Sequence, residues 1–543
     1  MRHFQVAADS ALETFRARPR ESLLRASSSG CSMSAGFPQQ GCQPPGSNMF
    51  RFVFAVLLMS ASAFRASACD VTTVRDAASF AAIDTESVAA FYESTGGCAW
   101  DDAADAAMMS AVRGAADDGL DPALFHADLL EGAAVRDEER DVLLTDAAIK
   151  YAVALTRGLS APRPEKVDQA MGSLVHGEVI DGLARALGRR EVGDWLSGLV
   201  PTSEAYSRLR SALAFYRAIA AAGGWDLTPA AVAGKRRGKL IPALRRRLAM
   251  EGDLTVNDGS ARFDESLRAA VERFQRRNGL RADGKVNTKT IERLNVSASQ
   301  RVAQIALNLE RLRLQGVPTP TRVEVNAPAA TAVLYREGAV HLAMNAVVGS
   351  PGNDTPSLSS AIDTIILNPT WTVPQSIIRN EIKPAIRRDR DYLTKNRMYW
   401  AGDQLVQEPG PHNALGRIKF DFPNPYSVYL HDTPARRLFL DPERAQSHGC
   451  VRLEKPLELA TELLRDDPEW DREAIEQAIR DGATRRIPLG QAMPVIIVYH
   501  TAFVDDEGLT HFRPDIYGLD TQLTLAMSQR AVTMRSEGSL GSF

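Results

Sequence analysis

The chain has 543 residues, of which 44% are hydrophobic, and its formal net charge is -3. A chain of this length exceeds what one hydrophobic core can organise, so two to four domains are expected. The hydrophobic content is typical of globular proteins. The nearly balanced charge, without a long basic run, gives no indication of a nucleic-acid partner.

The first 68 residues have the composition of segments that lie outside a fold. Residues 1–48 are predicted to be disordered or a mis-assigned extension, because their second half is rich in Ser, Gly, Pro and Gln. Residues 49–68 combine a basic residue, a short apolar run and small residues before Cys69, as in a secretory signal peptide. Translation is therefore expected to start at Met49, and the mature protein is expected in the periplasm. The alternative is an uncleaved membrane anchor.

Three cysteines remain after such a cleavage, namely Cys69, Cys98 and Cys450. In an exported protein Cys69 and Cys98 could pair, which leaves Cys450 as the free thiol. Alternatively, Cys69 is lipidated and Cys98 is a buried apolar residue. Membrane association is therefore expected only through an uncleaved signal peptide or a lipidated Cys69.

Residues 69–235 are predicted to form a helical scaffold domain. Apolar residues recur at helical spacing in 143–155 and again in 203–221. Thr202 or Ser203 is the expected N-cap of the second helix, because each precedes the periodic run directly.

Residues 236–298 are predicted to form a compact three-helix unit. Helices are expected at 239–248, at 265–277 and from Thr288 onward, and Asn278-Gly279-Leu280 is expected to be a turn. The helix with Phe274-Gln275, this turn and the closing helix resemble the small three-helix peptidoglycan-binding domain.

Residues 299–520 are predicted to be a mostly β domain that begins with a linking helix. Runs of alternating polarity indicate strands, and Glu337-Gly338 is expected to be a hairpin turn. Residues 374–415 have poor strand signals and are predicted to form a lid over the site. Residues 521–543 are predicted to be a weakly ordered tail. The predicted fold class is therefore multidomain α+β, in which helical domains precede a β domain with an inserted lid.

The residues that could take part in catalysis cluster in two segments, 429–434 (Tyr-Leu-His-Asp-Thr-Pro) and 447–452 (Ser-His-Gly-Cys-Val-Arg). A cysteine nucleophile needs a thiolate, a base and donors for the oxyanion. Cys450 can supply the thiol, and His431 can act as the base because it ends a strand-like run. A neighbouring cationic imidazole would lower the pKa of the thiol.

The neighbours of Cys450 suggest supporting roles. Gly449 permits a close backbone approach, so the amides of Gly449 and Cys450 could face a carbonyl oxygen. Arg452 could bind a substrate carboxylate, and His448 is a second base or braces the loop. A cysteine with two histidines also suggests zinc, but only Asp432 could be a fourth ligand, so no metal or cofactor is expected.

Taken together, the two segments resemble the signature of the L,D-transpeptidase catalytic domain. The resemblance continues in residues 347–350, in Thr355-Pro356 and in residues 367–374, 413–420 and 423–424, and it covers roughly residues 201–520. It is closest to the large Gram-negative periplasmic members, which combine a helical scaffold, a peptidoglycan-binding domain and the catalytic domain. One departure is Glu454, where many members carry Asn.

The resemblance implies a β-sandwich-like catalytic domain and acyl transfer in two steps. Cys450 would attack the bond before the terminal D-alanine of a tetrapeptide stem, and His431 would move the proton. An amine of a second stem would then resolve the thioester as a 3→3 cross-link. Carbapenems would acylate the same cysteine. The residues expected to support the oxyanion or to contact the substrate are Ser447, His448, Gly449, Arg452, Tyr429 and Trp371.

The sequence leaves the acceptor open. With water the same chemistry gives an L,D-carboxypeptidase, and with a protein amine it anchors a lipoprotein to the wall. A non-enzymatic wall-binding scaffold is a further alternative, which the intact motif disfavours. A papain-like peptidase would place its cysteine before its histidine, and the order here is the reverse.

Overall fold

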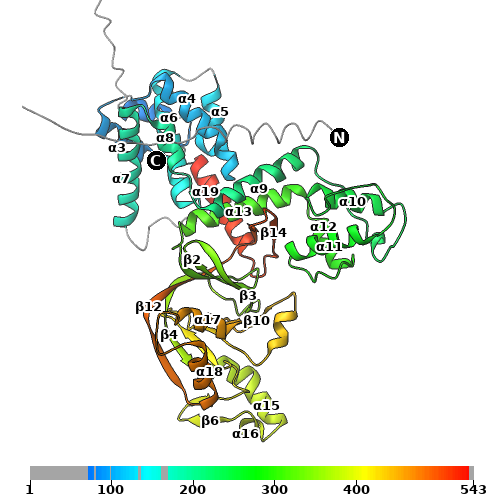
Figure 1. Ribbon diagram of the computed structural model, residues 1–543. Coiled ribbons are helices and arrows are strands. Elements are labelled where there is room, and N and C mark those ends of the chain that lie inside the picture. Colours follow the sequence, from blue (N-terminus) through cyan, green and yellow to red (C-terminus); the bar gives the residue numbers. More distant parts are fainter. Residues whose placement is uncertain (1–70, 79–80, 98, 133–135, 161–168, 537–543) are drawn as a thin grey trace, which may run out of the picture. The chain divides into compact units, whose positions relative to one another are not determined.

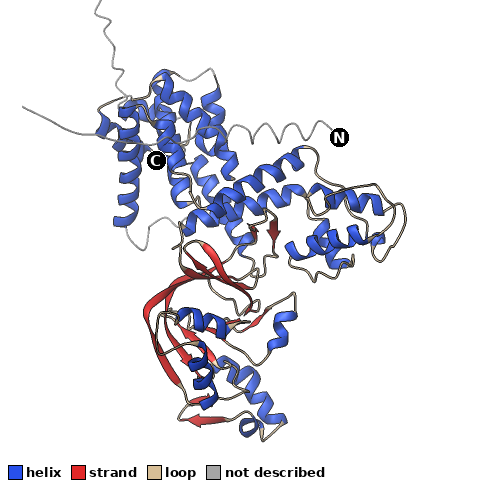
Figure 2. Cartoon of the chain, viewed as in Figure 1, coloured by secondary structure: helices blue, strands red, loops and turns tan. Residues whose placement is uncertain are grey.

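The computed structural model describes residues 71–536, apart from 79–80, 98, 133–135 and 161–168. The predictions for the signal peptide, Cys69 and Cys98 therefore concern residues outside the described part of the chain. None of the described helices combines the length and hydropathy needed to cross a bilayer. Helices make up the first part of the chain and strands dominate the second, which confirms the predicted fold class (Figure 1 and Figure 2).

The helices between residues 71 and 198 share one apolar core, whereas the helix 204–221 packs in another core with Ile305, Leu309 and Phe512. The helix α6 (Asp137–Arg157) is central, because every residue from Asp141 to Leu155 except Val153 is buried. In α9 (Glu204–Ala221) the predicted N-cap is confirmed, since Ser203 Oγ accepts a hydrogen bond from the Tyr206 N–H at 3.3 Å. The other elements of this region are α2 (Val71–Ala78), α3 (Thr85–Thr95), α4 (Asp102–Gly114), η2 (Ala115–Asp118), η3 (Pro122–Phe125), α5 (Ala127–Glu131), α7 (Gln169–Arg189) and α8 (Val192–Gly198). The short helix η4 (Ala230–Val232) follows α9, and its Val232 belongs to the next core.

A second, smaller core joins α10 (Ile241–Met250), α11 (Glu265–Arg277) and α12 (Thr288–Leu294). The predicted helix 265–277 is confirmed, and it begins where the Asp264 carboxylate accepts a hydrogen bond from the Leu267 N–H at 2.9 Å. The buried Gln275 amide crosses this core and donates to Thr290 Oγ1 at 3.1 Å.

The β domain follows α13 (Ala298–Gln315) and is one nine-stranded sheet with the order β10-β3-β11-β9-β8-β4-β12-β1-β2. Because β2 also pairs with β3, the sheet closes on itself instead of splitting into two packed sheets. Glu337-Gly338 connects these two strands with positive φ values of 52° and 85°, so the predicted hairpin turn is confirmed. The strands are β1 (Arg322–Asn326), β2 (Thr331–Arg336), β3 (Ala339–Gly349), β4 (Leu358–Leu367), β8 (Ile418–Asp421), β9 (Leu430–His431), β10 (Ala445–Ser447), β11 (Val451–Leu453) and β12 (Arg485–Val498).

The inserted segment 374–415 has a small apolar core of its own. Contrary to its poor strand signals, it contributes β6 (Met398–Ala401) and β7 (Gln404–Gln407), which pair with each other. The strand β7 also pairs with β5 (Trp371–Thr372). These strands are too short to show a clear alternation in the sequence. The helical elements of the domain are α14 (Gln375–Ile377), the π-helix η5 (Ile378–Ile382), α15 (Lys383–Arg388), α16 (Tyr392–Lys395), η6 (Arg436–Leu440), α17 (Pro456–Leu463) and α18 (Arg472–Asp481).

The C-terminal prediction was wrong in part. Residues from Leu519 to Ser536 form the helix α19, which follows the hairpin of β13 (Ala502–Val504) and β14 (Thr510–Phe512). The apolar residues of α19 do not share one stripe, so helical periodicity is hidden in the sequence. Tertiary contacts stabilise the helix instead, since Met534 is buried in the core of the first helices.

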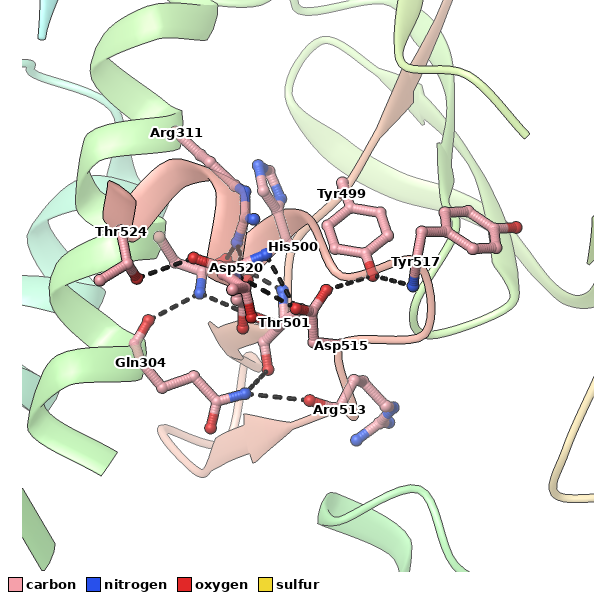
Figure 3. Close-up of polar contacts among 12 residues, drawn as sticks. Gln304, Arg311, Tyr499, His500, Thr501, Arg513, Asp515, Tyr517, Asp520 and Thr524 are labelled. Carbon is pink, nitrogen blue, oxygen red and sulfur yellow. Dashed lines mark hydrogen bonds and ion pairs between the residues drawn. The ribbon is translucent and has the colours of Figure 1, made fainter. Parts of the chain in front are cut away.

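Hydrogen bonds and an ion pair connect the linking helix α13 to the segment that follows β12 (Figure 3). Gln304 donates hydrogen bonds to the carbonyls of Thr501 and Arg513 at 3.0 and 2.9 Å, and Arg311 pairs with Asp520 at 2.6 Å. Tyr499 adds a bond of 2.7 Å from its hydroxyl to Asp515. The end of the last long strand is therefore held by a polar network rather than by apolar packing alone.

Candidate active site

Three neighbouring strands bring the segments 429–434 and 447–452 together. Lys419 of β8 pairs in register with His431 of β9, and His431 pairs with Arg452 of β11. Directly paired residues point to the same face of a sheet, so the imidazole lies between two cationic side chains. The sequence placed His431 at a strand end, but only the register shows that Lys419 is its neighbour.

The His431 imidazole is buried and oriented by the backbone. Its Nδ1 lies 2.5 Å from the Asp432 carbonyl oxygen, which can only accept a hydrogen bond. Nδ1 therefore carries the proton, and Nε2 keeps a lone pair for a substrate or thiol proton. Burial, and then the nearby Arg452 guanidinium, lower the pKa of His431 to about 3. The imidazole is thus neutral at pH 7, as a base must be.

Cys450 is a free, partly buried cysteine. Burial raises the pKa of its thiol above the usual value, against the smaller opposing effects of Tyr429, Lys419 and Arg452. The resting site therefore holds a neutral thiol and a neutral imidazole. The thiolate next to a cationic imidazole that the sequence suggested is not the resting state, because burial of both groups disfavours their charged forms.

The segment from Ser447 to Cys450 is a rigid turn braced by its own side chain. Ser447 Oγ donates to the Cys450 carbonyl at 2.5 Å and accepts from the Gly449 N–H at 3.2 Å. Gly449 has a φ of 109°, a conformation that a residue with a side chain rarely adopts. The Gly449 amide is therefore already used inside the turn, whereas no described residue accepts from the Cys450 N–H. This leaves the Cys450 amide as the available oxyanion donor of the two that the sequence suggested.

Thr355 and Tyr517 hold this turn from outside, and the sequence analysis assigned them no role. Thr355 Oγ1 donates to the Gly449 carbonyl at 2.7 Å and accepts from the Gly349 N–H at 2.8 Å. The Tyr517 hydroxyl donates to the Gly349 carbonyl at 2.7 Å. Tyr517 belongs to the polar network drawn in Figure 3, because its N–H donates to the Tyr499 hydroxyl at 2.8 Å. The Thr355-Pro356 pair was a sequence signal, but its partners are remote along the chain.

His448 faces the inserted segment instead of the thiol. Its Nε2 lies 2.6 Å from the Glu381 carboxylate, which belongs to the π-helix η5. The two side chains are 42% and 51% exposed, so the contact can open without burying an unpaired charge. This geometry favours the bracing role over the role of a second base.

The three residues predicted to contact substrate are Tyr429, Trp371 and Arg452. The Tyr429 hydroxyl contacts both Cys450 and the Trp371 side chain, and its burial raises the pKa of the phenol. Arg452 has a buried Nε without a hydrogen-bond partner among the described residues. A buried, unpaired guanidinium nitrogen is costly unless a ligand satisfies it, so Arg452 is placed to receive a substrate oxygen. Among the described residues, no group of three or more His, Cys, Asp or Glu is arranged to hold a metal ion.

Comparison with known proteins identifies the domains. Residues 320–496 match the family model described as "L,D-transpeptidase catalytic domain", residues 86–213 match a "Scaffold domain", and residues 237–294 match a "Putative peptidoglycan binding domain". A curated protein of Haemophilus influenzae, described as "Putative L,D-transpeptidase", is 30% identical over 244 residues. The match covers 41% of this chain and 49% of that protein, so the chain spans about half the length of its curated relative.

Two solved structures are also similar to this chain. An L,D-transpeptidase from Stackebrandtia nassauensis is 12% identical, with a TM-score of 0.20, over 49% of this chain and 93% of its own. An L,D-transpeptidase from Xylanimonas cellulosilytica is 15% identical, with a TM-score of 0.16, over 49% of this chain and 97% of its own.

The chain thus carries a catalytic domain that follows domains of scaffold and wall-binding type. Its residues 320–496, which contain both segments 429–434 and 447–452, match the L,D-transpeptidase catalytic domain family.

Proposed function

We propose that this protein is a peptidoglycan L,D-transpeptidase that forms 3→3 cross-links by cysteine acyl transfer. The observation that carries the proposal is the neutral, buried His431 held between two cations, beside the turn that presents Cys450. The match to the catalytic domain family and the peptidoglycan-binding domain support peptidoglycan as the substrate. Such a substrate agrees with the predicted periplasmic location.

In the first half-reaction Cys450 is the nucleophile. Its thiol proton passes to His431 Nε2 as sulfur attacks the carbonyl carbon before the terminal D-alanine of a tetrapeptide stem. The oxyanion that forms faces the Cys450 amide. The carbon–nitrogen bond breaks, His431 returns the proton to the departing D-alanine, and a thioester remains on Cys450.

In the second half-reaction a side-chain amine of another stem attacks the thioester. His431 is again the base, and it then gives the proton to the Cys450 sulfur as the carbon–sulfur bond breaks. Water in place of the amine gives a carboxypeptidase, and a lipoprotein amine gives a wall anchor. The site chemistry is the same in each case, so the product decides between them.

The direct test is mass spectrometry of purified muropeptides after incubation with the full chain. We expect release of D-alanine and appearance of 3→3 dimers, and we expect neither from a Cys450→Ser variant whose circular dichroism matches the wild type. Loss of D-alanine without dimers would leave only the carboxypeptidase. If folded wild-type protein produced neither change, the proposed function would be wrong.

A further inference from the structure

A cavity of 650 Å³ opens in the helical domain, and residues of α4, α6, α8 and α9 line it. Its volume lies within the range of about 300–1,000 Å³ that is typical of ligand pockets. Small residues on one face of α4 make room for it, namely Ala107, Ser110, Ala111 and Gly114. The described lining includes no residue of the catalytic domain or of the three-helix unit 236–298.

Two buried polar groups at this cavity have no hydrogen-bond partner. Tyr151 is 4% exposed, and no described residue bonds to its hydroxyl. Burial, and then the nearby Asp118 carboxylate, raise the pKa of this phenol, so the hydroxyl stays protonated and able to donate. Asp118 is 1% exposed, and its Oδ1 accepts from the Tyr206 hydroxyl at 3.0 Å, whereas no described residue donates to its Oδ2. Because buried polar groups are nearly always hydrogen-bonded, both require a partner from the cavity.

The charges of the cavity cancel. Arg210 and Asp118 are the charged residues of its described lining, and Arg210 Nε lies 2.9 Å from Asp118 Oδ1 in an ion pair without hydrogen-bond alignment. No described residue accepts from Nη1 or Nη2 of Arg210, so the guanidinium keeps donors for a ligand. An anionic ligand would be repelled by the carboxylate and a cationic ligand by the guanidinium. The cavity therefore suits a neutral ligand.

Hydroxyl groups and apolar side chains make up the rest of the lining. Ser110, Thr202 and Ser207 are exposed, and their hydroxyls have no partner among the described residues. Leu196 and Val200 line the same cavity. A ligand that fills it must donate and accept several hydrogen bonds and also present an apolar face. A sugar ring does both, because it carries hydroxyls around its edge and C–H groups on its faces.

We propose that this cavity is a binding site for a neutral saccharide. One sugar hydroxyl donates to Asp118 Oδ2, and another exchanges a hydrogen bond with the Tyr151 hydroxyl. Arg210 and the hydroxyls at the mouth hold the outer part of the same ligand. A peptide stem of the wall fits less well, because its carboxylates would meet Asp118. The assignment does not depend on the chemistry at Cys450.

The saccharide is either part of a wall glycan strand or a free sugar, and two neutral probes of equal length distinguish these sources. Chitotetraose carries N-acetyl groups like a wall glycan, whereas maltotetraose carries hydroxyls alone. Saturation-transfer NMR with the full chain detects even weak binding and gives a Kd by titration. Binding of chitotetraose alone supports a glycan strand as the ligand, and binding of both supports a site for free sugars as well. Absence of binding with both probes at millimolar concentration would overturn the proposal.

Tyr151→Phe removes the unpartnered hydroxyl and keeps the buried ring. We expect the Kd of the sugar to rise about two- to tenfold, as for the loss of one hydrogen bond. Urea unfolding should show a stability no lower than that of the wild type, because no described residue loses a bond. A structural role of the hydroxyl would instead lower stability and leave the Kd unchanged, and that result would contradict the assignment.

Ser207→Trp should fill the mouth of the cavity and raise the Kd more than tenfold. Ser211→Trp is the matched control, because Ser211 is also exposed, lies one turn further along α9 and does not line the cavity. Equal binding by the two tryptophan variants would count against the site. If a stem tetrapeptide bound and no sugar did, and Ser207→Trp abolished this binding, the cavity would be a peptide site and the proposal would be wrong.

Hydrogen exchange followed by mass spectrometry locates the bound sugar on the full chain. Chitotetraose should slow exchange in residues 107–118 and 200–210, which line the cavity. Protection confined to residues 241–294 would place the sugar on the three-helix unit and overturn the proposal.

Discussion

Replacing Thr355 by valine tests whether the turn that carries Cys450 is positioned from outside. Thr355 is 2% exposed, and its hydroxyl satisfies the Gly349 N–H at 2.8 Å and the Gly449 carbonyl at 2.7 Å. Valine has nearly the same shape but leaves both backbone groups buried without partners. Each unsatisfied group costs about 1–3 kcal/mol, so we expect the two groups to lower the free energy of unfolding by about 2–6 kcal/mol.

Thr355→Ser is the matched control, because it keeps the hydroxyl and removes one methyl group. Loss of that methyl costs about 1 kcal/mol. Urea unfolding should therefore show that the serine variant is more stable than the valine variant. Hydrophobicity alone predicts the opposite order. Tyr517→Phe removes the hydrogen bond to the Gly349 carbonyl, and its free energy of unfolding should lie between those of the serine and valine variants.

The same variants should separate stability from catalysis. The rate of thioester formation, followed by intact mass after mixing with a carbapenem, should fall about 10- to 100-fold in Thr355→Val, since a turn displaced by a fraction of an ångström misaligns the nucleophile. Thr355→Ser should stay within about threefold of the wild type. A valine variant that is as stable and as fast as the serine variant would refute the reasoning.

Three further predictions concern the site and the inserted segment 374–415. The pKa of His431 falls from 6.5 in the unfolded chain to about 3 in the folded protein. Between these pH values the unfolded state therefore binds more protons than the folded state. The stability that depends on neutral His431 is fully present above pH 6.5 and is lost as the pH falls toward 3. Urea unfolding should show that the wild type loses about 2–3 kcal/mol more stability between pH 7 and pH 4.5 than His431→Gln; an equal pH dependence in both would contradict neutral burial. Glu381→Gln weakens an exposed ion pair with His448, so stability should change by less than about 1 kcal/mol while hydrogen exchange in the inserted segment becomes faster. Glu408→Gln weakens an exposed ion pair with Arg397 within the same segment and should leave exchange near the site unchanged. A carbapenem should add its mass to Cys450, as located by peptide mapping, and Cys450→Ser should show no adduct; an adduct on another residue of the wild type would count against the site.

Several local features could be predicted because their causes are local. The helix 265–277 and the Ser203 cap depend on residues a few positions apart, and the hairpin at Glu337-Gly338 depends on two residues that accept positive φ. The helix α19 could not be predicted this way, because its apolar residues form no single stripe and its partners lie far away in the chain.

The sequence by itself determined the chemical identity of the site, because its cysteine, histidines, glycine and arginine stand in two short segments, 429–434 and 447–452. Only the tertiary structure decided how these groups work. The pairing of β8, β9 and β11 places Lys419 and Arg452 on either side of His431, and burial sets the protonation of the imidazole and the thiol. Strand register and desolvation depend on contacts between distant segments, which local periodicity does not encode.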